Sequence, residues 1–210
     1  MNIFAIELSS AKGSIAHIQN GETLSKKEWT EDFRNREQLF TAIRELQINW
    51  DTIDCFAIGR GPGAFSGMRI SFSIINAFAA PNKTPVYALN SGASIAKELA
   101  LPQLAVIGDA RQKKVWMGVF KGTQLQDPFQ LVPTEELSNV LPKTTPIVSP
   151  DYNRLQPVLG KINWLTEKND FPDAIALGQL VEQRINKKVK SEPLEPLYMH
   201  PPVFTKPRFV

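Results

Sequence analysis

The part of the sequence that most constrains the fold is a glycine-rich bend between two apolar runs. Residues 54–80 read DCFAIGRGPGAFSGMRISFSIINAFAA. The short run at 55–59 predicts a buried strand, and the longer run at 67–80 predicts a helix that stops at Pro81. A strand, a tight bend and a helix in succession indicate an α/β protein.

The bend has a functional interpretation, in which it cradles a phosphate. The free amide groups and the dipole of a helix N-terminus favour anions, and Gly61, Gly63 and Gly67 would let the backbone approach a ligand closely. The specific phosphate motifs are absent, however. A P-loop needs a lysine followed by Ser or Thr where this chain has Met68-Arg69, and the third glycine comes one place too late for a dinucleotide fingerprint.

The bend also has a structural interpretation, in which it only turns the strand into the helix. Pro62 would fix the turn and Ser66 would cap the helix. Phe65 would pack on Ile70 as a hydrophobic staple, which sets the angle at which the chain enters the helix. The residues of the bend leave both interpretations open.

The rest of the chain divides into a regular first half and a less regular second half. The first half predicts a hairpin with a third strand, then helices and strands in alternation: 2–8, 13–19, 24–30, a helix at 35–48 with Asn35 near its N-cap, 55–59, 67–80, 85–89 and a helix at 91–100. The second half predicts a hairpin, a strand and a helix capped by Asp173: 104–110, 114–120, 145–149 and 173–186. Prolines at positions 193, 196, 201, 202 and 207 predict an extended tail.

Composition excludes several classes of protein. No apolar stretch approaches the roughly 20 residues of a membrane-spanning helix and the start has no secretory pattern, so we expect a cytoplasmic protein that binds no membrane. Cys55 is the only cysteine, which rules out an internal disulfide and predicts a small core residue. The net charge is +3, and the lysines at 185–190 lack interleaved aromatics, which favours a solvated helix end over a nucleic-acid patch.

Residues able to run a reaction are sparse. The two histidines, His17 and His200, lie far apart in the sequence, and no metal-binding spacing of His, Cys or Glu occurs. Asp109 and Arg111 are most simply a solvated or inter-domain ion pair. The remaining polar candidates lie in the first turn of the chain: Glu7, Ser9, Ser10 and Lys12.

The segment GRGPGAFSGMRI at 59–70 resembles the signature of the TsaB (YeaZ) family, bacterial proteins needed to make threonylcarbamoyladenosine in tRNA. Further matches are IFAIELSS at 3–10, GDARQKKVWMGVF at 108–120 and EPLYM at 195–199. The likeness therefore spans nearly the whole chain. It is strong at 59–70 and 108–112 and faint at 123–172.

The resemblance implies an α/β, two-lobed actin-like (ribonuclease-H-like) fold, with a mixed five-stranded sheet in the first lobe and a reduced second lobe. We expect residues 1–102 to form the first lobe and 103–210 the second, whose C-terminal helix and proline-rich tail pack back. An older label of the superfamily, M22 glycoprotease, would require a metal site that the sequence does not offer, so a metallopeptidase is the remote alternative.

The resemblance also implies a non-catalytic role. TsaB-like proteins partner TsaD, the paralogous subunit that carries the metal and transfers the threonylcarbamoyl group, and TsaE, an ATPase, joins them. We therefore expect this chain to have no catalytic residue, no metal and no other cofactor. It should form a homodimer when alone and reach tRNA only through the complex.

The expected partner surface is the helix pair 36–48 and 67–80. The second helix is apolar over more than one face, so either an exposed face is covered by a partner or the helix is buried on both sides within its own domain. Arg60 and Arg69 would anchor the rim. The candidate partner-binding residues are Arg60, Met68, Arg69, Phe72, Ile74, Ile75, Phe78, Leu39 and Ile43.

The alternative from the enzyme class is an ATP-dependent actin-like kinase or transferase. In that hypothesis the first turn and the glycine bend hold the phosphates of ATP and its magnesium through Ser9, Ser10, Lys12, Gly61, Gly63, Ser66 and Gly67. Glu7 stands where actin-like ATPases usually place an aspartate for the metal-nucleotide site, and its longer side chain displaces the carboxylate. That departure favours the subunit hypothesis.

Overall fold

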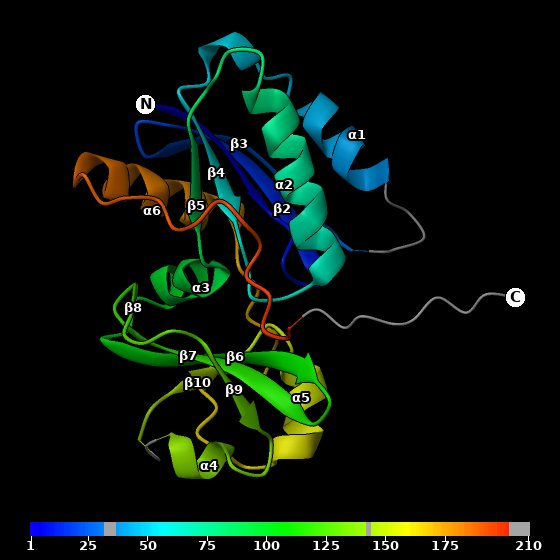
Figure 1. Ribbon diagram of the computed structural model, residues 1–210, viewed down its shortest axis with the longest axis vertical. Helices are drawn as coiled ribbons and strands as arrows, with labels where there is room; N and C mark the ends of the chain where they lie inside the picture. Colours follow the sequence, from blue (N-terminus) through cyan, green and yellow to red (C-terminus); the bar gives the residue numbers. More distant parts are fainter. Residues whose placement is uncertain (32–36, 142–143, 202–210) are drawn as a thin grey trace, which may run out of the picture.

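The computed structural model describes residues 1–31, 37–141 and 144–201. In it the chain forms two lobes, each built on a five-stranded sheet, one above the other along the long axis of the molecule (Figure 1). The first sheet has the order β3-β2-β1-β4-β5 and consists of β1 (Asn2–Glu7), β2 (Lys12–Gln19), β3 (Glu22–Thr30), β4 (Cys55–Gly59) and β5 (Val86–Leu89).

The first sheet is mixed, as predicted. Strands β1, β2 and β3 pair antiparallel as a meander, whereas β1, β4 and β5 run parallel. The carboxyl ends of the three parallel strands therefore meet at one edge of the sheet. This edge brings Glu7, Arg60 and Asn90 into one neighbourhood, because each stands at or just beyond the end of one of these strands.

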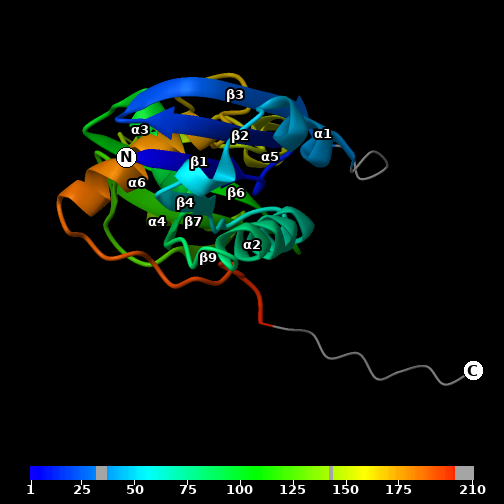
Figure 2. The ribbon, with the colours of Figure 1, turned by 90° about the horizontal axis from the view of Figure 1, so that it is seen from above.

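Helices cover both faces of this sheet, which explains why its central strands are apolar throughout. Phe4 and Ile6 of β1 pack toward α1 and α2, whereas Ile3 and Ala5 pack toward α6 on the opposite face (Figure 2). The helices of this lobe are α1 (Glu37–Glu45), α2 (Phe65–Ala79), α3 (Ser91–Leu99) and α6 (Ala174–Asn186), with a short 3-10 turn η1 (Trp50–Thr52).

Helix α6 belongs to the end of the chain but packs on the first sheet. Its predicted N-cap is confirmed, since the Asp173 carboxylate accepts from the Ile175 amide at 2.8 Å. Gly178 lies where a Cβ would come within 2.2 Å of Ile18, so this glycine lets the helix approach β2 closely. The last helix thereby completes the core of the first lobe.

The second lobe is smaller and contains shorter elements. Its sheet has the order β10-β6-β7-β8, with β9 also paired to β7. No helix within the described ranges is long and apolar enough to cross a membrane. The elements of this lobe are β6 (Gln103–Arg111), β7 (Lys114–Lys121), β8 (Gln124–Leu125), β9 (Gln130–Pro133), α4 (Leu137–Val140), β10 (Ile147–Val148) and α5 (Tyr152–Leu159).

The start of α2 differs from the prediction. The helix begins at Phe65, with Ala64 at the N-cap and no side chain capping it, so the predicted Ser66 cap and the Phe65–Ile70 staple are wrong. Because Phe65 already belongs to the first turn, its ring points outward and packs on Tyr198 instead. The predicted Asn35 cap of the preceding helix lies outside the described residues.

The proline-rich tail is extended and docked as far as residue 200. We call residues 188–200 the C-terminal strap. It lies along β5, where Glu192 bridges Ala88 and the Tyr87 hydroxyl reaches the Val189 carbonyl at 2.7 Å (Figure 1). At its far end, His200 Nε2 donates to the Ala110 carbonyl of β6 at 2.6 Å. The strap thus covers the β5 edge and joins the two lobes.

Candidate functional site

The glycine bend lies directly on the turn between β1 and β2. The Ala64 amide donates to the Ser9 carbonyl at 2.6 Å. A Cβ on Gly63 would stand 1.9 Å from the Ser9 oxygen, and a Cβ on Gly67 would stand 1.9 Å from the Leu8 oxygen. These glycines therefore allow two backbones to touch, which supports the structural interpretation of the bend.

The residues proposed to hold nucleotide phosphates lie on the turn between β1 and β2 and on the glycine bend, and these two segments contact each other directly. Ser10 Oγ bonds within its own turn, 3.2 Å from the Lys12 amide. The Lys12 ammonium turns toward β3 and pairs with Glu28 at 2.7 Å. The backbone contact between Gly63 and Ser9 leaves no room for a phosphate between the two turns in this structure.

Glu7 is fully buried at the end of β1. One carboxyl oxygen accepts from the Ser9 amide at 2.8 Å, and the other has no partner among the described residues. The carboxyl fills the space that Gly59 leaves open, since a Cβ there would lie 1.8 Å from Glu7 Oε2. Burial raises the pKa of the Glu7 carboxyl above its ordinary value of 4.5, because desolvation disfavours the charged form.

The buried Glu7 predicts a pH-dependent stability that Glu7→Gln removes. A carboxyl with a raised folded-state pKa contributes fully to stability below pH 4.5, and the contribution is lost as pH rises toward the raised pKa. The loss amounts to about 1.4 kcal/mol of unfolding free energy for each pH unit between the two pKa values. Urea unfolding from pH 4 to 8 measures it. If the unfolding free energy of the parent and of Glu7→Gln declined equally with rising pH, Glu7 would not be the source of the pH dependence.

Arg60 ties the end of β4 to the C-terminal strap. Its side chain is buried, with Nε donating to the Glu195 carbonyl at 3.0 Å and Nη1 lying 3.5 Å from the Glu192 carboxylate. Glu192 also accepts from Asn90 Nδ2 at 2.7 Å. Arg60 is therefore an internal anchor of the strap in this structure, and not an exposed rim residue.

The predicted partner-binding residues of the two helices separate into an inner and an outer set. The inner set is buried: Leu39, Ile43, Phe72 and Ile75 pack against the sheet, and Met68 lies against Gly61 of the bend. Ile74 and Phe78 are half-buried, and Arg69 is exposed. Of the predicted residues on these two helices, only the outer set of Ile74, Phe78 and Arg69 has side-chain surface that a partner could contact.

Sequence reasoning missed the most exposed large apolar side chain of α1 and α2. Phe40 on α1 is 57% exposed and lines a groove of about 580 Å³ between α1 and α2, together with Phe78 and Ile43. The sequence does contain a signal for this exposure. Leu39 and Phe40 are adjacent apolar residues, and neighbours on a helix cannot both face the same core, so one of them had to point outward. We call Phe40, Ile70, Ile74 and Phe78 the α1–α2 surface.

Asp109 and Arg111 form an ion pair within the second lobe. Their charged groups lie 3.3 Å apart, and Arg154 of α5 approaches the same carboxylate at 3.0 Å. The Asp109 amide donates to Asp151, whose pKa is raised by burial. The predicted ion pair forms, but both of its members and Arg154 belong to one lobe. The nearby contact that joins the two lobes is made by the Ala110 carbonyl, which accepts from His200 of the strap.

Metal-ligating side chains are scattered. Within residues 1–31, 37–141 and 144–201, no group of three or more His, Cys, Asp or Glu side chains could hold a metal ion.

Comparisons with known proteins give the fold a family context. A family model described as TsaD, tRNA N6-adenosine threonylcarbamoyltransferase, matches residues 37–130. A crystal structure of an uncharacterized protein with similarity to peptidase YEAZ, from Pseudomonas aeruginosa, superposes with a TM-score of 0.80 at 20% identity, covering 95% of this chain and 99% of that chain. YeaZ from Pseudomonas aeruginosa gives 0.76 at 21%, covering 94% and 99%. In fold, the chain is similar to YeaZ.

The resemblance to the TsaB (YeaZ) family predicted from the sequence is thereby confirmed, together with the two-lobed actin-like fold. At these identities, the structural matches establish the fold alone. What the chain binds must be argued from its own surface.

Proposed function

We propose that the YeaZ-like chain is a non-catalytic subunit that binds a TsaD-like threonylcarbamoyltransferase and supports threonylcarbamoyladenosine modification of tRNA. The observation that carries the proposal is the groove between α1 and α2, with Phe40 standing 57% exposed beside Phe78. A large apolar side chain exposed over an apolar groove is typical of a surface that a partner covers.

The α1–α2 surface suits a helical partner. Ile70, Ile74 and Phe78 recur every four residues along α2, so they form one row on the helix. Such rows pack into the grooves of another helix or helix pair. Glu37 and Arg44 flank Phe40 and give the groove a charged rim, as interfaces with an apolar centre commonly have.

The proposal has further parts that follow from the same resemblance. The complex includes a TsaE-like ATPase, works in the cytoplasm and contacts tRNA mainly through the TsaD-like subunit. The chain needs no metal or nucleotide of its own, which agrees with the contact between Gly63 and the Ser9 turn. Without its partner the chain forms a homodimer over the same α1–α2 surface.

Phe40→Asp tests the partner surface. A carboxylate in the centre of an apolar interface should weaken binding to a purified TsaD-like protein by about 100-fold or more, because the charge would lose its water. The thermal midpoint of the isolated variant should stay within a few degrees of the parent, since Phe40 is exposed. Isothermal titration calorimetry measures the affinity.

The matched control is Val158→Asp on α5 of the second lobe, where the replaced side chain is 66% exposed. It introduces the same charge away from the α1–α2 surface and should leave binding unchanged. A parent chain that does not bind the TsaD-like protein, or a Phe40→Asp variant that binds as tightly as the parent, would refute the proposal.

A further inference from the structure

The C-terminal strap is held to the first lobe by separate contacts. Pro193 and Pro196 have no amide hydrogen to donate, so a continuous ladder with β5 cannot form. Within the described residues the strap makes one β-bridge to this strand, between Glu192 and Ala88. Several of its large apolar side chains are exposed: Val189, Leu194 and Tyr198. Little buried apolar area therefore holds the strap in place, which is typical of segments that open locally.

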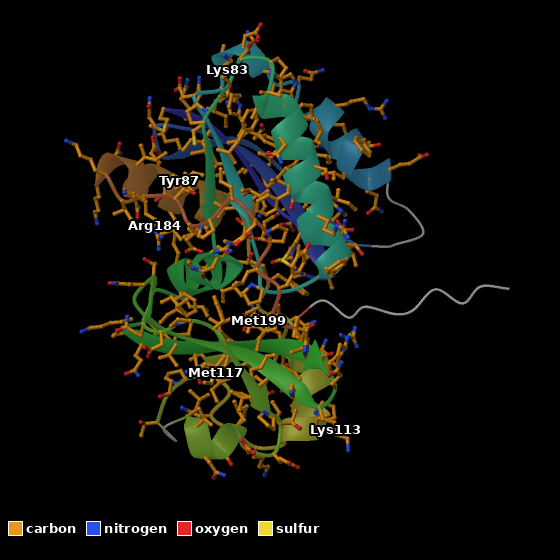
Figure 3. All side chains as sticks on the ribbon, in the orientation of Figure 1. Lys83, Tyr87, Lys113, Met117, Arg184 and Met199 are labelled. Atoms are coloured by element: carbon orange, nitrogen blue, oxygen red, sulfur yellow. The ribbon has the colours of Figure 1, made fainter. Side chains whose placement is uncertain are left out.

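The strongest contact of the strap is the charged cluster around Glu192. The carboxylate accepts from Asn90 Nδ2 at 2.7 Å and lies 3.5 Å from Arg60 Nη1 and 3.8 Å from Arg184 Nη1. Contacts of a carboxylate with cations are stronger than hydrogen bonds between neutral groups. Arg184 lies near the start of the strap, whereas Met199 lies near its end, between the two lobes (Figure 3).

The burial of Arg60 depends on the docked strap. Its side chain is 9% exposed, and among the described residues both acceptors of its guanidinium belong to the strap. These are the Glu192 carboxylate and the Glu195 carbonyl, which Nε reaches at 3.0 Å. A buried guanidinium without acceptors is costly, so Arg60 must turn into water when the strap leaves. Docking of the strap and burial of Arg60 are therefore one event.

The structure also defines the segment that can open. Helix α6 ends at Asn186 and keeps Leu177 in the core, so an opening that starts at the strap stops at the helix. At the other end, Met199 packs against the core between the lobes, and His200 donates to the Ala110 carbonyl at 2.6 Å. These two contacts must release together with the Glu192 cluster.

We propose that the C-terminal strap is a latch: it opens as a unit while both lobes stay folded, and the Glu192 carboxylate holds it closed. In the closed state the strap masks the Arg60 guanidinium and the β5 edge. In the open state Arg60 is the exposed cation that the sequence predicts. The device belongs to the isolated chain, so its test is independent of the proposed function.

Glu192→Gln tests the latch, because it keeps the size of the side chain and removes its charge. Hydrogen exchange at the Leu197 amide, which donates to the Arg60 carbonyl at 2.7 Å, should become about tenfold faster or more. Exchange at the amides of β4 should stay as in the parent. Phenylglyoxal, followed by mass spectrometry, should label Arg60 faster in the variant by a similar factor, whereas the exposed Arg69 should react equally in both.

The matched control is Glu195→Gln on the same strap. The Glu195 side chain is exposed, and its backbone carbonyl, which accepts from Arg60, is kept by the substitution. This variant should exchange and react as the parent does. If Glu192→Gln also matched the parent in both measurements, Glu192 would not hold the strap and the inference would be overturned.

A measurement on the parent tests whether the strap opens by itself. Below the unfolding transition, exchange at the Leu197 amide should be nearly independent of urea, because a local opening exposes little surface, whereas exchange in β4 should accelerate with urea. An equally steep response of both would mean that the strap opens only when the whole chain unfolds, which overturns the latch. This result decides the question even if Glu192→Gln does not fold.

Discussion

Gly67→Ala is expected to lower the unfolding free energy by about 3 kcal/mol, although alanine is the better helix former by about 1 kcal/mol. The reason is the added Cβ, which would stand 1.9 Å from the Leu8 carbonyl oxygen and 3.0 Å from its carbon. Both are backbone atoms of a strand end, so neither can rotate away, and α2 must shift from the sheet. For a chain of this length, the midpoint of thermal unfolding should fall by roughly 6–12 °C.

The control for this prediction is Ser66→Ala, one residue earlier on the same turn. Ser66 is exposed and caps nothing, so its replacement should change the unfolding free energy by less than about 0.5 kcal/mol. If Gly67→Ala proved as stable as the parent, or more stable, the close contact between bend and strand would be refuted, and the glycine would need another explanation.

Ile75→Asp is expected to abolish folding. Ile75 has no exposed surface and lies between α2 and the sheet, in the cluster that includes Phe4 and Phe56. An aspartate there would have to bury a charge without a partner, at a cost of more than about 4 kcal/mol. That is close to the whole stability of many domains, which is about 5–15 kcal/mol. Circular dichroism and soluble yield measure the outcome.

Asn76→Asp provides the matched control, since the next residue along α2 is exposed and receives the same charge. It should fold with a melting temperature near that of the parent. A folded Ile75→Asp variant with the parent's melting temperature would mean that this face of α2 is open to water. The division into an inner and an outer set would then be wrong.

The sequence predicts the regular elements of the first lobe well, because each carries its own periodicity or cap. The strand at 55–59 is observed with the same bounds, and Asp173 caps α6 as expected. The second lobe is less predictable. Its β8 and β10 have two residues each, so pairing with a long neighbour decides their structure and local sequence has little influence.

The candidate site is less predictable than the fold, because its contacts join residues far apart in the chain. The glycine spacing indicates a close approach, but the sequence does not identify Leu8 and Ser9 as the atoms approached. The same limit applies to Arg60, because the sequence motif alone suggests that this arginine is exposed at the surface. Its partners Glu192 and Glu195 lie on a tail whose path only tertiary structure determines.

The path of the chain after α6 has a consequence for biosynthesis. Among the described residues the strap covers the β5 edge of the first sheet, and α6 covers one face of that sheet, so the first-lobe strands depend on residues 174–200 for their cover. Until the ribosome has released α6 and the strap, a nascent chain exposes an unpaired strand edge and an apolar sheet face. Both are features that chaperones recognise and that promote aggregation.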